Sequence, residues 1–290
     1  MSKSMGYFYA ILAALLNGFI GIFSVKIIQI GLPPYAVSFY KCFLALVMIT
    51  CVLIATNQFS QWLLYFKTNW KKVSLCAFFG FFMLYFFETT AYKYTKVPLV
   101  VFLLLGFATI TTFILKGIFN KRFLNRSEVI SCIFAVIGLI LLFDVKHLHN
   151  QNILGILCAV IAGIGYGLFL TFSSRLKIGS GLIVVNTLML FGCVYLFVPF
   201  IIGGAQGIPN LISLIYLIAL AIFPTIGGFW CTTKALSILS SESVQLLELT
   251  EPIFSILLAW IILSQKLNFI QLLGSTLVLI AICINMYRAK

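Results

Sequence analysis

Apolar runs long enough to cross a bilayer follow one another along the whole chain, and this pattern constrains the fold more than any other feature. A membrane-spanning helix needs about 20 predominantly apolar residues. Windows of that length predict ten spans, at 6–29, 34–55, 73–94, 98–118, 127–144, 153–175, 182–203, 211–235, 244–263 and 268–288. The breaks between them carry turn or charge signals, such as Gly31-Leu-Pro-Pro and Asn69-Trp-Lys-Lys. The sequence therefore predicts an all-α integral membrane protein with ten transmembrane helices.

Composition argues against two other classes of protein. Only 9% of the residues are charged, whereas a soluble domain carries about 25%, and no polar block is long enough to form one. The net charge of +13 does not indicate nucleic-acid binding, because the basic residues stand singly or in small groups between apolar runs. All eight cysteines lie in apolar runs without a CxxC pair, which favours small buried hydrophobic residues over metal ligands.

The distribution of lysine and arginine predicts the orientation. With the N-terminus inside, eleven basic residues fall in cytoplasmic segments: Lys3, Lys67, Lys71, Lys72, Lys121, Arg122, Arg126, Arg175, Lys177, Arg288 and Lys290. Three fall in outer segments: Lys96, Lys146 and Lys266. Cytoplasmic loops carry the excess of positive charge, so both termini are predicted to be cytoplasmic in a multi-pass protein of the cell (inner) membrane. The first apolar run is too long for a cleavable signal and is interpreted as the first helix.

The two halves of the chain share an internal repeat. Sliding residues 6–26 onto 155–175 aligns six identical residues, and later pairs such as Thr89 with Thr233 keep the same order along both halves. We therefore divide the chain into two units, at 1–146 and 147–290, with five predicted helices each.

An odd number of helices makes the second half enter the membrane in the opposite sense to the first. Inverted repeats of this kind are common in secondary transporters, whose substrate site lies near the middle of the bilayer between the repeats.

The ninth predicted span holds two acids beside a proline. Glu248 and Glu251 are three residues apart, and on a regular helix they share one polar stripe with Gln245, Pro252 and Ser255. Pro252 removes the hydrogen bond to the Glu248 carbonyl and frees a backbone acceptor. Two carboxylates this close resist joint ionisation, so one proton or a bound cation between them is expected. The alternative is a structural role for both acids, in which they pair with the opened backbone and a nearby lysine.

A second candidate lies on the third predicted span. Tyr85, Glu88 and Tyr92 share one helix face, and a carboxylate between two aromatic rings suits a cationic group. The alternative is a salt bridge from Glu88 to Lys41 or Lys93, with the tyrosines as ordinary packing residues.

Four further residues complete the predicted site. Lys234 is expected near the cytoplasmic side, where it closes an inner gate with Glu248 or holds a substrate carboxylate. Trp230, one turn earlier, is a stacking surface or a packing residue. Asn17 and Tyr166 occupy equivalent positions of the repeat, so both are expected to face the central cavity.

No cofactor and no metal site are predicted. The chain has no phosphate-binding glycine motif, so transport would not be driven by ATP hydrolysis within this chain. His147 and His149 form an HxH pattern near Asp144, which we interpret as a solvated outer loop.

Several motifs resemble the drug/metabolite transporter superfamily, in particular its EamA-type members with ten helices. The most specific is Leu249-Thr-Glu-Pro-Ile-Phe followed by Leu263-Ser-Gln-Lys-Leu, which is similar to the family's Glu-Pro helix and the turn after it. Asn17-Gly18 and Tyr166-Gly167 resemble the aromatic-Gly step of the first helix in each half. The resemblance implies that Glu251-Pro252 is the family pair, with a structural or gating role. The chain departs from the pattern at four places: Lys41, Ala108-Thr109, Lys121-Arg122 and Gln265-Lys266.

Together these features predict a secondary or facilitative transporter that works by alternating access. The expected substrate is a small polar metabolite, an amino acid or another amine-bearing compound, with protons as a candidate coupling ion and the oligomeric state open. One alternative is a larger organic cation such as S-adenosylmethionine or a drug. Another is an intramembrane enzyme with a buried glutamate, although the chain lacks an HExxH motif and an intramembrane aspartate pair.

Overall fold

A computed structural model describes residues 3–95, 97–121, 126–142, 152–204, 209–254 and 269–288. Helices and turns make up these residues, and no strand occurs among them. The first half contains α1 (Lys3–Asn17), α2 (Ile20–Gln29), α3 (Pro34–Ala55), α4 (Phe59–Ala77), η1 (Phe78–Phe86), α5 (Phe87–Tyr94), α6 (Val97–Asn120) and α7 (Arg126–Leu142). The second half contains α8 (Ile153–Arg175), α9 (Leu182–Ile202), α10 (Leu211–Leu220), η3 (Ala221–Gly228), α11 (Phe229–Leu236), α12 (Ser241–Glu248) and α14 (Phe269–Arg288).

Seven helical stretches of the described chain are long and apolar enough to cross a membrane. They are Lys3–Gln29, Pro34–Ala55, Phe59–Tyr94, Leu99–Phe119, Ile153–Arg175, Leu182–Ile202 and Leu211–Leu236. The protein is therefore a multi-pass membrane protein. The other three predicted spans overlap α7, α12 and α14. Of these, the ninth predicted span is described only as far as residue 254. The count of ten crossings stays a prediction.

The first predicted helix is not continuous. α1 ends at Asn17 and α2 begins at Ile20, with a turn at Gly18 and Phe19 between them. Asn17 therefore lies at the end of a helix, inside a span that the sequence pattern predicts as a single rod.

The helix that contains the third predicted span begins earlier than the sequence pattern indicates. The structure is helical from Phe59 through α4, η1 and α5 to Tyr94, so the helical stretch has 36 residues. At 1.5 Å per residue it is roughly 50 Å long, against a hydrocarbon core of about 30 Å. The polar run with Lys67, Lys71 and Lys72 was interpreted as a break, but it contains neither Gly nor Pro and continues the helix. These lysines are exposed, as expected for a part that leaves the hydrocarbon region.

The ninth predicted span is interrupted instead of forming one regular helix. α12 ends at Glu248, Leu249 and Thr250 form a turn, and helix resumes at Glu251. Pro252 has no N–H to donate to the Glu248 carbonyl, which removes a bond that would continue the first segment. The predicted single polar stripe is therefore wrong in its geometry, and Ser255 lies outside the described residues.

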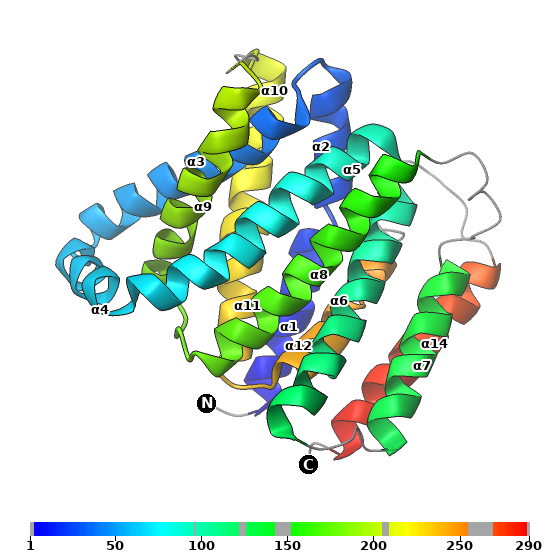
Figure 1. Cartoon of the computed structure of the whole chain (residues 1–290). Helices are drawn as coiled ribbons and strands as arrows, with labels where there is room; N and C mark the ends of the chain where they lie inside the picture. Colours follow the sequence, from blue (N-terminus) through cyan, green and yellow to red (C-terminus); the bar gives the residue numbers. More distant parts are fainter. Residues whose placement is uncertain are drawn as a thin grey trace.

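Tightly packed helix pairs place the central elements side by side. α8 packs along α6 on one side and along η1 and α5 on the other (Figure 1). α9 packs on α3 and α4, while α7 and α14 form a separate pair. α12 contacts α1, α6 and α8, and Glu248 in its last turn is buried in the interior of this bundle.

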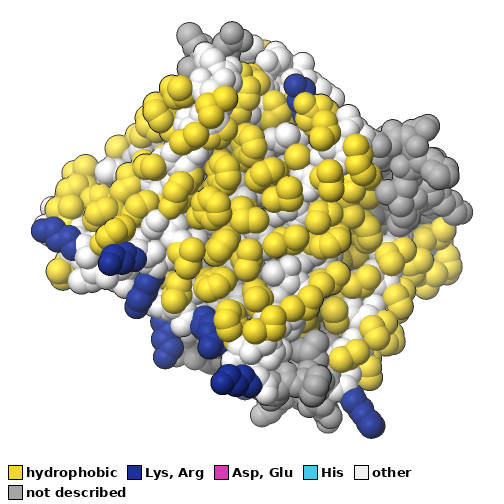
Figure 2. All heavy atoms as spheres, viewed as in Figure 1, with side chains coloured by type: hydrophobic (Ala, Val, Ile, Leu, Met, Phe, Trp, Pro, Cys, Tyr) yellow, Lys and Arg dark blue, Asp and Glu magenta, His cyan; other side chains and the backbone are white. Residues whose placement is uncertain are grey.

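The surface has two kinds of region. Apolar side chains cover the broad face shown in Figure 2, and lysine and arginine side chains gather along one edge of it. The described basic residues Lys67, Lys71, Lys72, Arg175 and Lys177 belong to segments predicted to be cytoplasmic. This separation is typical of a membrane protein whose basic edge faces the cytoplasm.

Candidate functional site

Glu248 is the most completely buried acid of the described chain and receives two hydroxyl donors. Its side chain has 0% exposure at the end of α12. The Tyr166 hydroxyl on α8 donates to Oε2 at 2.5 Å, and Thr232 Oγ1 on α11 donates to Oε1 at 2.7 Å. A carboxylate in a dry interior needs such donors, because an unpaired buried charge is costly. Three elements of the second half therefore meet at one carboxyl group.

Glycines on α8 bring Tyr166 into place. A Cβ on Gly163 would collide with the Leu104 carbonyl of α6, and a Cβ on Gly165 would come 2.6 Å from Met83 Cβ on η1. α8 can therefore lie in close contact with helices on two sides. The interpretation of these glycines as packing residues agrees with this geometry, and the packing fixes the direction of the Tyr166 side chain.

Lys41 and Glu88 form a second buried centre, between α3 and α5. Lys41 Nζ lies 4.0 Å from Glu88 Oε2, 3.4 Å from Thr89 Oγ1 and 3.7 Å from the centroid of the Tyr85 ring. The Tyr92 hydroxyl donates to Glu88 Oε1 at 3.1 Å. Tyr85, Glu88 and Tyr92 therefore do share a face, as predicted. The cation on that face is Lys41, the salt-bridge alternative, whereas Lys93 is exposed.

Glu251 has no hydrogen bond or ion pair with any residue in the described ranges, although only 9% of it is exposed. It interacts electrostatically with Glu88 and with Glu248, and also with Tyr92. Glu251 therefore lies near both centres, and the three carboxyl groups form one acidic cluster in the buried interior. We call Glu88, Glu248 and Glu251 the acidic cluster.

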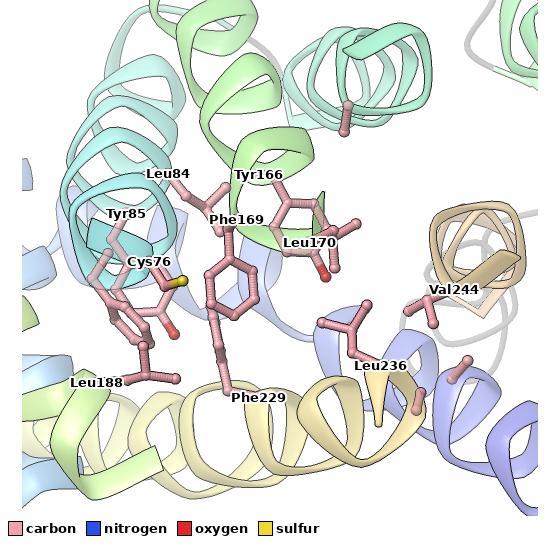
Figure 3. Packing of buried hydrophobic residues seen from close by; sticks show 14 of the residues in the cluster. Cys76, Leu84, Tyr85, Tyr166, Phe169, Leu170, Leu188, Phe229, Leu236 and Val244 are labelled. Atoms are coloured by element: carbon pink, nitrogen blue, oxygen red, sulfur yellow. The ribbon is translucent and has the colours of Figure 1, made fainter. Parts of the chain in front are cut away.

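A row of aromatic rings lies between the two tyrosines of the site. Figure 3 shows Phe169 of α8 and Phe229 of α11 between Tyr85 and Tyr166. Ring centroids are 5.6 Å apart for Tyr85 and Phe229, 5.2 Å for Phe229 and Phe169, and 6.2 Å for Phe169 and Tyr166. The acidic cluster thus has a continuous aromatic neighbour contributed by both halves of the chain.

Gln245 connects the second half to the first. Its Nε2 donates to the Leu105 carbonyl and to Thr109 Oγ1 on α6, both at 3.3 Å. Its buried Oε1 has no hydrogen-bond partner in the described part of the chain. Gln245 therefore holds α12 against α6 and leaves one acceptor available one turn before Glu248.

The other predicted residues lie at the margin of this cluster. Asn17 is half-buried and its Oδ1 lies directly against the Gly228 backbone of η3. Trp230 packs edge-on against Tyr9, with Lys234 Nζ 5.9 Å from its ring centroid. No ion pair between Lys234 and Glu248 occurs among the described residues, and the gate between them stays a prediction.

The structure adds contacts that the sequence did not predict. Thr232 donates to Glu248 from a neighbouring helix, and nothing in its local pattern distinguishes it from other threonines of the chain. Lys116 of α6 and Glu242 of α12 form a largely buried salt bridge of 2.5 Å between the two halves. The available signal for this pair was a lysine inside the fourth predicted span and an acid just before the ninth.

The described residues contain no group of three or more His, Cys, Asp and Glu side chains that could hold a metal ion. His147, His149 and Asp144 lie outside the described ranges. The prediction that the HxH pattern is a solvated loop is therefore untested.

Comparisons with known proteins agree with a transporter. The model of the EamA-like transporter family matches residues 4–144 and 153–287. An uncharacterized transporter of Archaeoglobus fulgidus is 28% identical over 226 residues, which cover 75% of this chain and 79% of that protein. A solved crystal structure of a protein with 15% sequence identity has the same fold, with a TM-score of 0.78 over 99% of this chain and 98% of that chain. The chain is a membrane transporter that belongs to the EamA-like transporter family, within the drug/metabolite transporter superfamily.

Proposed function

We propose that this protein is a secondary transporter of a small polar metabolite that carries an amine, such as an amino acid. The observation that carries the proposal is the charge balance of the buried interior. The acidic cluster has three carboxyl groups, and among the described residues one lysine, Lys41, forms an ion pair with one of them, Glu88. Intramembrane carboxyl groups without a matching protein cation are costly and indicate a site for a cation or a proton.

Within this cluster, the amine is expected at Glu248 and Glu251. Lys41 already covers the Tyr85 ring and pairs with Glu88, so that carboxylate is partly neutralised. Glu251 has no partner in the described structure, and Glu248 has hydroxyl partners that leave its charge in place. We therefore assign the amine-binding role to Glu248 and Glu251, with Tyr166 and Gln245 as neighbours and Glu88 with Lys41 and Tyr92 as a structural centre.

Two features of the fold support an inverted repeat. η1 and η3 are π-helical segments, and each is followed by an eight-residue α-helix that ends the span, α5 in the first half and α11 in the second. The aligned threonines Thr89 and Thr233 lie on these two helices. The family model also covers the chain in two consecutive stretches, one in each proposed half, 1–146 and 147–290. Rocking of these halves around the acidic cluster would give alternating access.

Protons are the proposed coupling ion. A carboxyl group binds the substrate amine in its ionised form. When it takes up a proton it loses its charge and releases the amine, so the proton and the amine compete for the same site. Glu251 suits this exchange, because no other side chain of the described structure has to be displaced. In liposomes a pH gradient should then drive accumulation of the amine, and the Glu251→Gln variant should lose this dependence.

A larger organic cation such as a sulfonium nucleoside is the second candidate. The aromatic row from Tyr85 through Phe229 and Phe169 to Tyr166 favours it, because aromatic faces attract cations and stack on planar groups.

A thermal-shift screen of the purified protein tests both candidates. The panel contains amino acids, polyamines, nucleosides and sulfonium compounds, and it is repeated with Glu88→Gln, Glu248→Gln and Glu251→Gln. An amine that stabilises the native chain and loses its effect in Glu248→Gln or Glu251→Gln supports the proposal. If ligands without an amine or sulfonium group are the ones that stabilise the protein, the substrate class is wrong.

A further inference from the structure

A cavity of about 320 Å³ opens at the ends of α8 and α11, away from the acidic cluster. Its polar lining consists of Ser173, Ser174, Lys177, Thr233 and Ser237, and apolar residues near Leu236 complete the wall. The segment with Lys177 belongs to the end of the molecule that the basic residues assign to the cytoplasm. The volume is enough for a small metabolite. A pathway that carries only amines would not need a lysine at this position.

The charged and polar side chains of this cavity suit an anion. Thr233 and Ser237 donate their hydroxyls to the backbone carbonyls of Trp230 and Lys234. Ser173 Oγ is buried beside the Cys76 thiol, so Ser174, which is partly exposed and makes no side-chain hydrogen bond within the described ranges, is the available hydroxyl. Lys177 is the charged residue of the lining, and no acid contributes to it. An ammonium group beside hydroxyl donors is the arrangement that binds a carboxylate.

The backbone around Lys177 forms a well-defined helix end. The N–H of Ile178 bonds to the Ser173 carbonyl and the N–H of Lys177 to the Ser174 carbonyl, which is the hydrogen-bond pattern of a Schellman helix end. The residue at the position of Lys177 has a φ of +50°, where glycine is usual. This helix end fixes the backbone of Lys177 at the wall of the cavity.

The cavity is separate from the amine site but connected to it along two helices. Thr233 follows Thr232, the donor to Glu248, and Ser173 lies seven residues after Tyr166 on α8. Seven residues correspond to about 10 Å along a helix axis. The two charged groups of an α-amino acid are much closer together than this, so one molecule cannot occupy both places at once.

We propose that this cavity is a cytoplasmic anion-binding station for the substrate carboxylate, with Lys177 as its counter-ion and Ser174 as a hydrogen-bond donor. The station binds the carboxylate before the amine reaches Glu248, or after the amine has left it. The identity of the ligand as an amino acid rests on the proposed function, whereas the preference for an anion does not.

Charged thiol reagents test the anion preference without a known substrate. Ser174→Cys places a thiol on the cavity wall, and its modification is followed by mass spectrometry of the peptide that contains it. The probes are a methanethiosulfonate with a sulfonate group and one with a trimethylammonium group. We expect Lys177→Gln in the Ser174→Cys background to lower the rate ratio of sulfonate to trimethylammonium reagent about fivefold. Lys67→Gln, which removes an exposed lysine of the same end, should leave the ratio unchanged.

An unchanged ratio in Lys177→Gln would overturn the station. A second variant, Lys177→Gly, guards against misfolding as an explanation. Glycine relieves the positive φ, so its melting temperature should be equal to or above that of the native chain, while the charge preference is lost. A lower melting temperature with the charge preference intact would mean that Lys177 serves only to end the helix.

Protection by ligands separates this proposal from the proposed function. L-Leucine, L-phenylalanine and L-arginine should slow modification of Ser174→Cys more than their carboxamides do, because the amides lack the carboxylate. Equal protection by acids and amides contradicts the carboxylate station but leaves the amine site intact. Charge preference without protection by any of these compounds keeps an anion station and rejects amino acids as the substrate class.

Discussion

At the residue scale, the site depends on pairing buried charges with donors from other helices. The sequence pattern placed Glu88, Glu248 and Glu251 inside the membrane, because acids in long apolar runs are rare and visible. It did not predict that Tyr166 and Thr232 both donate to Glu248, since partners on other helices depend on how the spans pack. The presence of buried acids was therefore predictable from the sequence, whereas the hydroxyl groups that donate to them could be identified only from the fold.

The Tyr166→Phe variant tests the pairing at Glu248. It leaves one oxygen of a buried carboxyl group without its donor, which costs about 1–3 kcal/mol. Thermal unfolding in detergent should therefore show a lower melting temperature. Tyr216→Phe is the matched control, because Tyr216 has a ring contact with Phe23 and its hydroxyl has no hydrogen bond in the described structure. Equal melting temperatures for the two variants would refute a stabilising role for the Tyr166 hydroxyl.

The Lys41→Met variant tests the structural centre on the first half. Removing one partner of a buried ion pair costs about 3–5 kcal/mol, because the other charge stays unpaired. The double variant Lys41→Met with Glu88→Gln should recover most of that loss, since no charge is left over. Lys93→Met, at an exposed position on the same helix as Glu88, should change the stability by less than about 0.5 kcal/mol. If the double variant is as unstable as Lys41→Met alone, the loss of stability does not come from the unpaired charge of Glu88.

At the element scale, apolar periodicity predicted helices well and their interruptions poorly. α3 and α8 have the predicted bounds, 34–55 and 153–175, because each is a clean apolar run between polar or turn residues. The breaks at Gly18 and at Leu249 lie inside apolar runs, where hydropathy has no signal. Pro252 is a sequence signal for the second break, but the helix is interrupted about one turn before the proline, at Leu249.

Close contact between α8 and α6 is the element-scale feature that aims Tyr166 at Glu248. Gly163→Ala would place a Cβ against the Leu104 carbonyl, so we expect a loss of about 1–3 kcal/mol from overpacking. Gly106→Ala on α6 has open space at the new Cβ and should be neutral or stabilising by up to about 1 kcal/mol. Melting temperatures of the two variants check this. Similar shifts for both would indicate that the spacing of α8 and α6 is not restricted by Gly163.

At the scale of the whole molecule, the two halves pack on each other through several helix pairs, and α12 adds polar contacts to α6. Gln245 joins α12 to α6 close to the acidic cluster, and Lys116 pairs with Glu242 in the first turn of α12. The matched residues predict an internal repeat, which stays a prediction, and they do not predict which helices of the two halves pair. A membrane transporter that rocks its halves has to break and remake contacts of this kind, so they mark where movement is expected.

Transport by the purified protein tests the central claim most directly. The protein is reconstituted in liposomes, and uptake of radiolabelled amino acids and polyamines is compared between the native chain and Glu248→Gln. Gel filtration and melting temperature confirm that the variant is folded. The account predicts saturable uptake of at least one amine by the native chain and a loss of more than about tenfold in Glu248→Gln. Uptake of an amine at the native rate by a folded Glu248→Gln variant would contradict it.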